Sequence, residues 1–326
     1  MNFKKKLLIL LSFLTFIFPI VVNAYSDKVI LGGDNIGISV DTKDILVVGF
    51  YKVNGKFIAK ESGFLEGDRI TKVNGNVVTS IEELIKEINN SGSDRVTFTV
   101  KRLESTLDIT LDLVKENDIY KTGLYIKDQI TGVGTLTYID PETMIFGSLG
   151  HEIVDSKTGR ILEIDDGYIF ESSVTGTIKS TNSKTGEKQA KFYQDNINGT
   201  IDKNTDRGIF GKYLSKLNKD NLIEVGTIED ITLGPAKIYT VLKDNEIKSF
   251  DINIIKINDD STTKNILFEI TDEELLKTTN GVIKGMSGSP IVQNNKIIGA
   301  ITHAIVNDNL KGYGIFITKM LEEGDK

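Results

Sequence analysis

The stretch "GVIKGMSGSPIV", residues 281–292, combines residue types that could perform nucleophilic chemistry. Ser287 lies between Gly285 and Gly288, and Pro290 and an apolar, strand-like run follow. A serine hydroxyl becomes a nucleophile when a base removes its proton, and the developing oxyanion needs backbone N–H donors. Glycines allow the tight backbone that directs such N–H groups inward. The alternative is an ordinary glycine-serine turn, so the interpretation depends on a base.

The base must be a histidine, and the chain has 2 histidines. A Gly-x-Ser-Gly-x-Pro motif before a strand, a polar hairpin and a second strand is the pattern of chymotrypsin-like serine proteases, which use the order His, Asp, Ser. His151 precedes Ser287 by 136 residues, as that order requires, and is predicted to be the base. His303 follows Ser287 by only 16 residues and is predicted to line the substrate cleft or to lie on the surface.

The carboxylate that would orient the histidine is harder to identify, because 46 acidic residues compete. Asp155 is too close to His151 in sequence, and Asp165 and Asp166 are in a predicted turn. Asp272 follows a predicted strand and lies between the histidine and the serine in chain order. It could equally be the N-cap of a helix, so the residues alone leave its role open.

Composition excludes several other kinds of chemistry. The net charge is −7 and no basic cluster lies outside the N-terminus, which argues against a nucleic-acid partner. There is no cysteine, which excludes disulfides, thiolate metal sites and a cysteine nucleophile. Two well-separated histidines make a poor zinc site, so we expect neither a metal nor an organic cofactor.

Residues 1–26 are predicted to be a signal peptide or a membrane anchor. Three lysines at positions 4–6 precede an apolar run over residues 7–22, and a small-residue cleavage site ends at Ala24. This order is typical of export signals, although the apolar run is almost long enough to span a bilayer. The body of the protein is therefore expected to work outside the cytoplasm, in contact with the membrane at least until residues 1–26 are processed.

Residues 28–115 are predicted to form a small domain of short strands with one main helix. A buried strand is expected at 45–50, an Asn-Gly hairpin within 62–78 and a helix at 80–90, with Ser80 as its N-cap. The segment "SGFLEGDRITKVNGNVVTSIEEL" resembles bacterial PDZ domains, which have an α+β fold with a small, partly open barrel.

The resemblance implies a peptide-binding role for this PDZ domain. Its carboxylate-binding loop would fall at Ile36, Gly37 and Ile38, where a glycine lets N–H groups converge on a chain-terminal carboxylate. The next strand would accept a peptide by edge addition. Alternatively, the domain only braces its neighbour and binds no peptide.

Residues 120–326 are predicted to be mainly β, after a linker at 115–120. Strand-like runs alternate with glycine, asparagine and aspartate turns, and only 272–279 and 317–324 have a helical pattern. Many short strands over about two hundred residues indicate an all-β barrel or sandwich assembly.

The chain resembles the stage IV sporulation protein B family of serine peptidases, in which a PDZ domain precedes a chymotrypsin-like double β-barrel. The matching segments cover nearly all of the chain after residue 26, in order; they include "ILVVGF", "GLYIKDQITGVGTLTYIDPET", "GSLGH", "NGTIDKNTDRGIFG", "LGPAKI", "GVIKGMSGSPIVQNNKIIGAITHAIVND" and "GYGIFI". The resemblance implies a triad of His151, Asp272 and Ser287, with an oxyanion hole made by the N–H groups of Gly285 and Ser287.

The resemblance also implies a physiological role. Members are exported into the space between forespore and mother cell, cleave themselves in trans with help from the PDZ domain, and then cut the exposed domain of a membrane protein to activate a late sigma factor. Two alternatives stay open at this point. One is a PDZ scaffold with an inactive protease domain, and the other is a housekeeping quality-control protease, although such enzymes usually place the protease before the PDZ domain.

Overall fold

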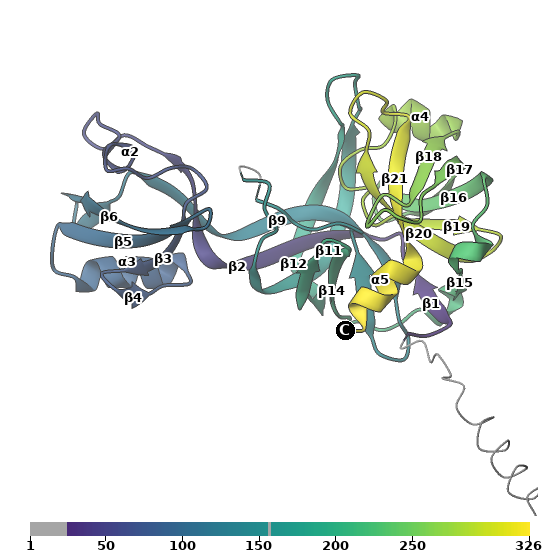
Figure 1. Cartoon of the computed structure of the whole chain (residues 1–326), viewed down its shortest axis with the longest axis horizontal. Coiled ribbons are helices and arrows are strands. Elements are labelled where there is room, and N and C mark those ends of the chain that lie inside the picture. The colour runs from purple at the N-terminus through teal and green to yellow at the C-terminus, as the bar shows by residue number, and fades with distance from the viewer. Residues whose placement is uncertain (1–24, 156–157) are drawn as a thin grey trace, which may run out of the picture.

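The computed structural model describes residues 25–155 and 158–326, so positions 1–24 of the predicted export segment lie outside the described residues. The chain is mainly β and forms a PDZ unit and a larger two-barrel body (Figure 1). The long strands β2 (Asn35–Phe50) and β9 (Leu124–Ile139) pair with each other and run through both parts. Within the described ranges, no helix is both long and apolar enough to cross a membrane.

The PDZ unit contains the end of β2, the start of β9 and a set of short elements between them. These are α2 (Ile58–Glu61), β3 (Arg69–Val73), β4 (Asn76–Val77), α3 (Ile81–Asn90), β5 (Arg95–Arg102), β6 (Ser105–Asp112), β7 (Val114–Glu116) and β8 (Ile119–Lys121). The predicted helix is confirmed as α3: the Ser80 hydroxyl accepts the Glu83 N–H at 3.2 Å, and Leu84 and Ile88 are buried. The predicted Asn-Gly hairpin joins β3 to β4.

Two predicted boundaries differ from the structure. Strand β1 (Lys28–Leu31) and the first half of β2 belong to the two-barrel body, where they pair with β9, β11 and a strand of the second barrel. The PDZ unit therefore does not begin at residue 28. The predicted linker at 115–120 forms the β7–β8 hairpin, and the parts are joined instead by the β2–β9 ribbon.

The first barrel is a ring in the order β2, β9, β10, β14, β12 and β11. Its further strands are β10 (Ile145–Ser148), β11 (Ile164–Ile178), β12 (Glu187–Thr200), β13 (Lys203–Thr205) and β14 (Gly208–Lys212). Strand pairs form most of the ring, and a single bridge between Gly199 and Tyr213 joins the end of β12 to β14. Its core contains buried Ile38, Phe146 and Ile169.

The second barrel is a closed ring in the order β16, β17, β18, β21, β20 and β19. Its elements are η1 (Lys219–Asn221), β15 (Leu222–Val225), η2 (Ile228–Asp230), β16 (Gly234–Val241), β17 (Ile247–Ile257), β18 (Ile266–Ile270), α4 (Glu273–Thr279), β19 (Pro290–Gln293), β20 (Lys296–Ala304), β21 (Lys311–Phe316) and α5 (Ile317–Gly324). Alternation places Phe250, Ile252 and Ile254 of β17 in the barrel core, as expected for a half-buried strand. Both predicted helices are confirmed, as α4 and α5.

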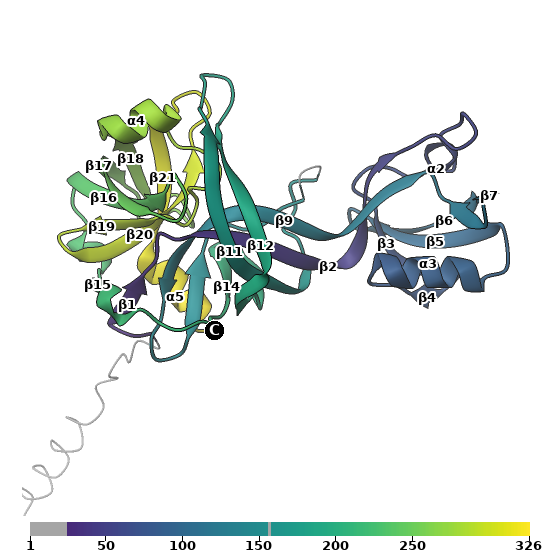
Figure 2. The same cartoon turned by 180° about the vertical axis from the view of Figure 1, so that it is seen from behind.

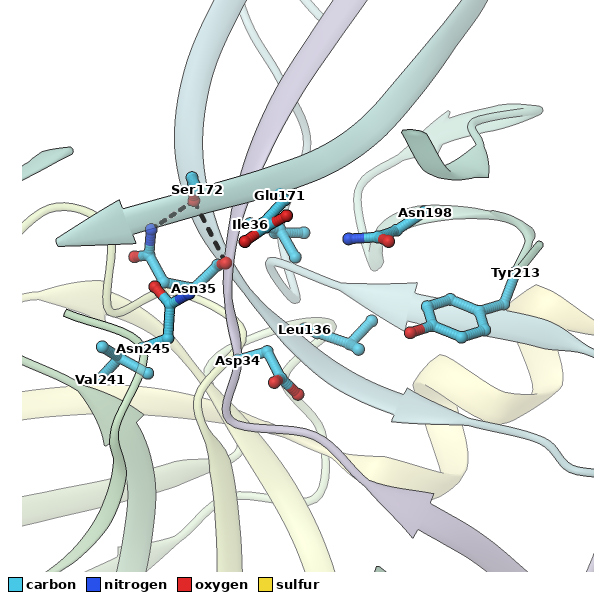
Figure 3. A pocket seen from close by; sticks show the side chains of 10 residues that line it. All are labelled: Asp34, Asn35, Ile36, Leu136, Glu171, Ser172, Asn198, Tyr213, Val241 and Asn245. Carbon is cyan, nitrogen blue, oxygen red and sulfur yellow. Dashed lines mark hydrogen bonds between the residues drawn. The ribbon is translucent and has the colours of Figure 1, made fainter. Parts of the chain in front are cut away.

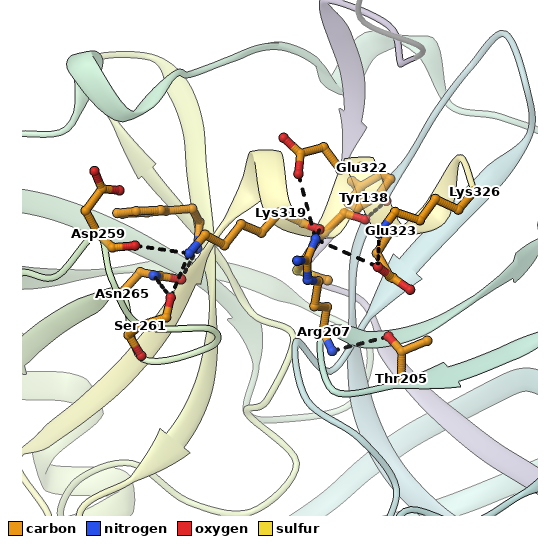
Figure 4. Close-up of polar contacts among 12 residues, drawn as sticks. Tyr138, Thr205, Arg207, Asp259, Ser261, Asn265, Lys319, Glu322, Glu323 and Lys326 are labelled. Atoms are coloured by element: carbon orange, nitrogen blue, oxygen red, sulfur yellow. Dashed lines mark hydrogen bonds and ion pairs between the residues drawn. The ribbon is translucent and has the colours of Figure 1, made fainter.

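Helix α5 ties the two barrels together (Figure 4). Lys319 donates to the carbonyl of Ser261 in the second barrel at 2.6 Å. On the other side, the guanidinium of Arg207 lies 3.7 Å from the carboxylate of Glu322, and the Tyr138 hydroxyl of β9 donates to the Met320 carbonyl at 3.3 Å. These contacts hold the barrels in a defined relation, which a site between them requires.

The β11–β12 hairpin extends alongside the second barrel (Figure 2). Near its tip, the Ser180 N–H donates to the Thr279 carbonyl at 2.8 Å. Farther from the tip, the Lys188 N–H donates to the Lys284 carbonyl at 3.0 Å, and the Lys284 N–H donates to the Gly186 carbonyl at 2.8 Å. A hairpin of the first barrel thus supports the segment that carries Ser287.

Candidate active site

Ser287 lies in the turn between α4 and β19, and two glycines shape this turn. Gly285 and Gly288 have φ of 90° and 88°, in the left-handed region that residues with a Cβ rarely adopt. A Cβ at Gly288 would lie 2.6 Å from the Leu149 nitrogen and would also collide with the Thr135 carbonyl. The turn therefore packs directly against β9 and against the segment that leads to His151.

Thr135 of β9 connects the serine turn to the first barrel. Its N–H donates to the Ser287 carbonyl at 3.0 Å, and its buried hydroxyl donates to the Gly285 carbonyl at 2.8 Å. Its own carbonyl accepts the hydroxyl of Ser148, at the end of β10, at 2.6 Å. One residue thus links the nucleophile turn to the strand that precedes the histidine.

His151 follows β10 by way of Leu149 and Gly150, which both have positive φ. A Cβ on Gly150 would lie 2.9 Å from Thr302 Cγ2, so this turn is pressed against β20. The His151 Nδ1 lies 2.7 Å from the Glu152 carbonyl oxygen. A carbonyl oxygen only accepts, so Nδ1 carries the proton and Nε2 is the nitrogen free to act as a base.

His151 and Ser287 line one cavity of about 350 Å³ between the two barrels. Gly285 and His303 line it too, and its walls also include Val133, Thr185, Val282, Ile283, Lys284, Ile301, Thr302 and Ala304. The structure therefore brings together two of the three predicted triad members, both predicted oxyanion residues and the predicted cleft residue. These positions are up to 152 residues apart in sequence, between His151 and His303.

Burial favours the neutral form of both imidazoles in this cavity. Desolvation lowers the pKa of His151 below its ordinary value, and the Glu152 carbonyl only partly opposes this shift. Burial together with the charges of His151 and Lys264 lowers the pKa of His303 to about 4. The two rings are 5.3 Å apart between centroids, so a proton on one imidazole disfavours a proton on the other.

The serine turn leaves two N–H groups available to a ligand. The N–H groups of Lys284, Met286 and Gly288 donate to backbone carbonyls. Over residues 25–155 and 158–326, by contrast, the N–H groups of Gly285 and Ser287 make no hydrogen bond. Two unused backbone donors at the edge of a cavity, beside a serine, have the composition of an oxyanion hole.

Asp272 lies apart from this cavity, at the N-cap of α4. Its carboxylate accepts the Leu275 N–H at 2.9 Å and the Asp251 N–H at 3.3 Å. The helix-cap interpretation is therefore confirmed. Because Glu152 supplies the acceptor for His151 Nδ1, the role of Asp272 as the orienting carboxylate stays a prediction.

The predicted position of the PDZ carboxylate-binding loop, at residues 36–38, is wrong. Ile36, Gly37 and Ile38 lie within β2 of the first barrel, paired on one side with β9 and on the other with β11. Both isoleucines are 3 % exposed, and a Cβ on Gly37 would overlap the Phe170 ring. The two isoleucines are part of the first-barrel core, so the alternation of apolar residues here indicates a buried strand and not a binding loop.

The PDZ edge expected to receive a peptide is occupied by the chain itself. Strand β2 pairs through Leu46 with β3 on one side and with the start of β9 on the other. An apolar cavity of about 320 Å³ lies between α3 and the segment 118–126, with Ile85 and Ile119 exposed at its rim. Edge addition next to β2 would require the start of β9 to leave.

Sequence reasoning missed the supports of the site. Thr135 lies in an ordinary alternating strand, and Lys188 lies in a polar run that has the appearance of a surface loop. Both become visible only as buried polar groups, with 0 % and 5 % exposure, behind the serine turn. No local sequence signal could have identified either residue, because their partners come from distant strands.

Comparisons with known proteins identify the family of the chain. The family model of the SpoIVB peptidase S55 matches residues 118–321, and a PDZ domain model matches residues 53–102. No curated protein matches. Among solved structures, the PDZ domain of an SdrC-like protein from Listeria monocytogenes is 20 % identical, covering 27 % of this chain and 93 % of that one with a TM-score of 0.23. The chain therefore belongs to the SpoIVB peptidase S55 family of serine peptidases and carries a PDZ domain.

Proposed function

We propose that the chain is a serine endopeptidase that works through an acyl-enzyme with Ser287 as nucleophile and His151 as base. The Ser287 Oγ attacks the scissile carbonyl while His151 Nε2 takes its proton. The N–H groups of Gly285 and Ser287 hold the oxyanion. His151 then protonates the leaving amine, and a water activated by the same nitrogen releases the acyl group.

One observation carries this proposal: the imidazole and the hydroxyl line one cavity, beside two unused backbone N–H groups. The protonated Nδ1 supports it, because Nε2 is then the basic nitrogen. An orienting role for Asp272 is part of the family expectation and is tested separately below.

We further propose that this sporulation peptidase is exported, cleaves itself and then cuts the exposed domain of a membrane protein to trigger late sigma-factor activation. Family membership and the export signal predicted at residues 1–26 support this role. The same enzyme chemistry would serve self-cleavage and target cleavage. The occupied PDZ edge suits a domain that changes partners between these two steps.

The first experiment asks whether Ser287 is an activated nucleophile. A fluorophosphonate forms an O–P bond to such a serine with loss of fluoride, while the base takes the proton. We expect wild-type protein to be labelled at Ser287, and Ser287→Ala to lose both labelling and self-cleavage, since loss of a triad member costs about 10⁴-fold or more. Labelling elsewhere, or continued self-cleavage by purified Ser287→Ala, would refute the assignment. A folded wild-type protein without labelling would indicate a PDZ scaffold.

A further inference from the structure

Lys188 is a buried lysine that the proposed mechanism does not use. It lies on β12 with 5 % exposure, directly behind the serine turn. Lysine is almost never fully buried unless its charge is paired, because taking an ammonium out of water is costly. In the described part of the chain, no carboxylate forms an ion pair with it, so its retention needs another reason.

The Lys188 ammonium has three hydrogen-bond partners, which matches its three donors. Nζ donates to the Thr240 hydroxyl at 3.0 Å, to the Thr135 hydroxyl at 3.3 Å and to the Asn35 Oδ1 at 3.4 Å. All three partners are neutral, and the neighbouring charged residues Glu187 and Lys284 are exposed. The ammonium is therefore solvated by the protein and not neutralised by it.

Ser172, which lines a small pocket together with Asn35, fixes the orientation of the Asn35 amide (Figure 3). The Asn35 Nδ2 donates to the Ser172 hydroxyl at 2.6 Å, and this hydroxyl donates in turn to the Asn35 carbonyl at 3.1 Å. With Nδ2 engaged by Ser172, Oδ1 is the amide atom presented to Lys188. The lysine site is thus built from both barrels, with Asn35 and Thr135 from the first and Thr240 from the second.

Lys188 also contacts the serine turn through its backbone and its aliphatic stem. Its N–H donates to the Lys284 carbonyl at 3.0 Å. In a trans peptide the C=O and N–H point in opposite directions, so this bond directs the Gly285 N–H away from β12. A Cβ on Gly285 would lie 3.1 Å from Lys188 Cδ, so the stem supports this glycine from behind.

We propose that Lys188 is a positioning residue for the oxyanion hole. Its ammonium holds the Thr135 hydroxyl, which donates to the Gly285 carbonyl, while its stem and N–H hold the Lys284–Gly285 peptide. The Gly285 N–H is thereby kept toward the substrate carbonyl oxygen. This inference rests on the proposed peptidase function and adds a residue that touches neither substrate nor base.

Burial of the Lys188 ammonium lowers the free energy of unfolding by a measurable amount. Burial lowers the pKa of Lys188 to about 7, from 10.5 for a free lysine. Between these two pH values the unfolded chain binds more protons than the folded protein, so the free energy of unfolding rises with pH. The charged form therefore weakens the fold at neutral pH and below. A residue kept at such a cost is typical of functional sites.

The test compares Lys188→Met with wild type, using the fluorophosphonate as the probe. Methionine keeps an apolar stem and removes the donors. We expect the maximal labelling rate to fall by about 10–100-fold with unchanged apparent affinity for the reagent, since misplaced oxyanion donors slow the chemical step. We also expect a melting temperature at pH 6 at or above that of wild type, and loss of the stability rise between pH 7 and 10.5. The exposed Lys191 of the same strand provides the control Lys191→Met, which should change none of these quantities.

Thr135→Val is the second variant, since it removes the hydroxyl between Nζ and the Gly285 carbonyl. We expect a similar loss of rate, and a double variant with Lys188→Met that is little slower than either single one, because both act through one contact. Unchanged labelling in Lys188→Met or Thr135→Val, or a rate loss matched by a lower melting temperature, overturns the inference. Wild-type protein without labelling at Ser287 would instead refute the peptidase proposal.

Discussion

Gly288→Ala is predicted to damage the site and the fold together, because this glycine is where the serine turn presses on the first barrel. A residue with a Cβ at φ of 88° costs about 1–2 kcal/mol. The new Cβ would lie 2.6 Å from the Leu149 nitrogen, and such overpacking typically costs a further ~1–3 kcal/mol. The sum is about 2–5 kcal/mol, or a melting temperature lower by about 4–20 °C for a body of this size.

The functional effect of Gly288→Ala should exceed its effect on stability. Leu149 precedes His151 by two residues, so relieving the clash separates the imidazole from the serine. A displacement near 1 Å costs on the order of 100-fold in rate, to be measured as fluorophosphonate labelling at a temperature where the variant is folded.

Gly75→Ala is the matched control for this prediction. Gly75 has φ of 87°, but no atom lies within 4 Å of the position that a Cβ would take there, so only the backbone cost applies. We expect this variant to label at the wild-type rate. If Gly288→Ala labels within twofold of wild type and melts no lower than Gly75→Ala, the reasoning about the packed turn is refuted.

Two further predictions concern the histidine and the aspartate. Burial lowers the pKa of His151 below 6.5, and attack by the serine needs the neutral ring. The labelling rate should therefore rise with pH to a plateau, with a midpoint under pH 6.5. A midpoint above pH 6.5 contradicts the assignment of His151 as the base. Asp272→Asn should leave the free energy of unfolding within about 0.5 kcal/mol, because asparagine caps a helix as well as aspartate, whereas Asp272→Ala should lose about 1 kcal/mol. If Asp272→Asn is as stable as wild type but about 10⁴-fold slower, the Asp272 carboxylate contacts His151 during turnover. If its activity is retained, Asp272 serves only as the N-cap of α4.

Much of the fold could be predicted because its signals are local. The Asn74-Gly75 pair predicted a hairpin, since both residues accept the positive φ that its turn requires. Helix α3 was predicted from Ser80 and the spacing of Leu84 and Ile88, which depend only on neighbouring residues. Helices α4 and α5 were predicted within one residue of their ends for the same reason.

The errors arose where a pattern has two structural meanings. The alternation around Gly37 suits a PDZ loop followed by a strand, and it equally suits a continuous barrel strand. Which one forms depends on whether Phe170 of β11 packs over the glycine, and that contact joins positions 133 residues apart. The PDZ boundary was misplaced for the same reason, because β2 serves both parts of the chain.

By itself, the sequence determined the chemistry available to this protein: a serine in a glycine turn, a histidine upstream of it and no cysteine. Tertiary structure alone decided which groups meet. It placed His151 and Ser287 around one cavity, gave Nδ1 a backbone carbonyl as partner, assigned Asp272 to a helix cap and buried Lys188 behind Gly285. The physical reason is that residue type and spacing limit what a side chain can do, whereas burial and hydrogen-bond partners come from strands distant in the chain.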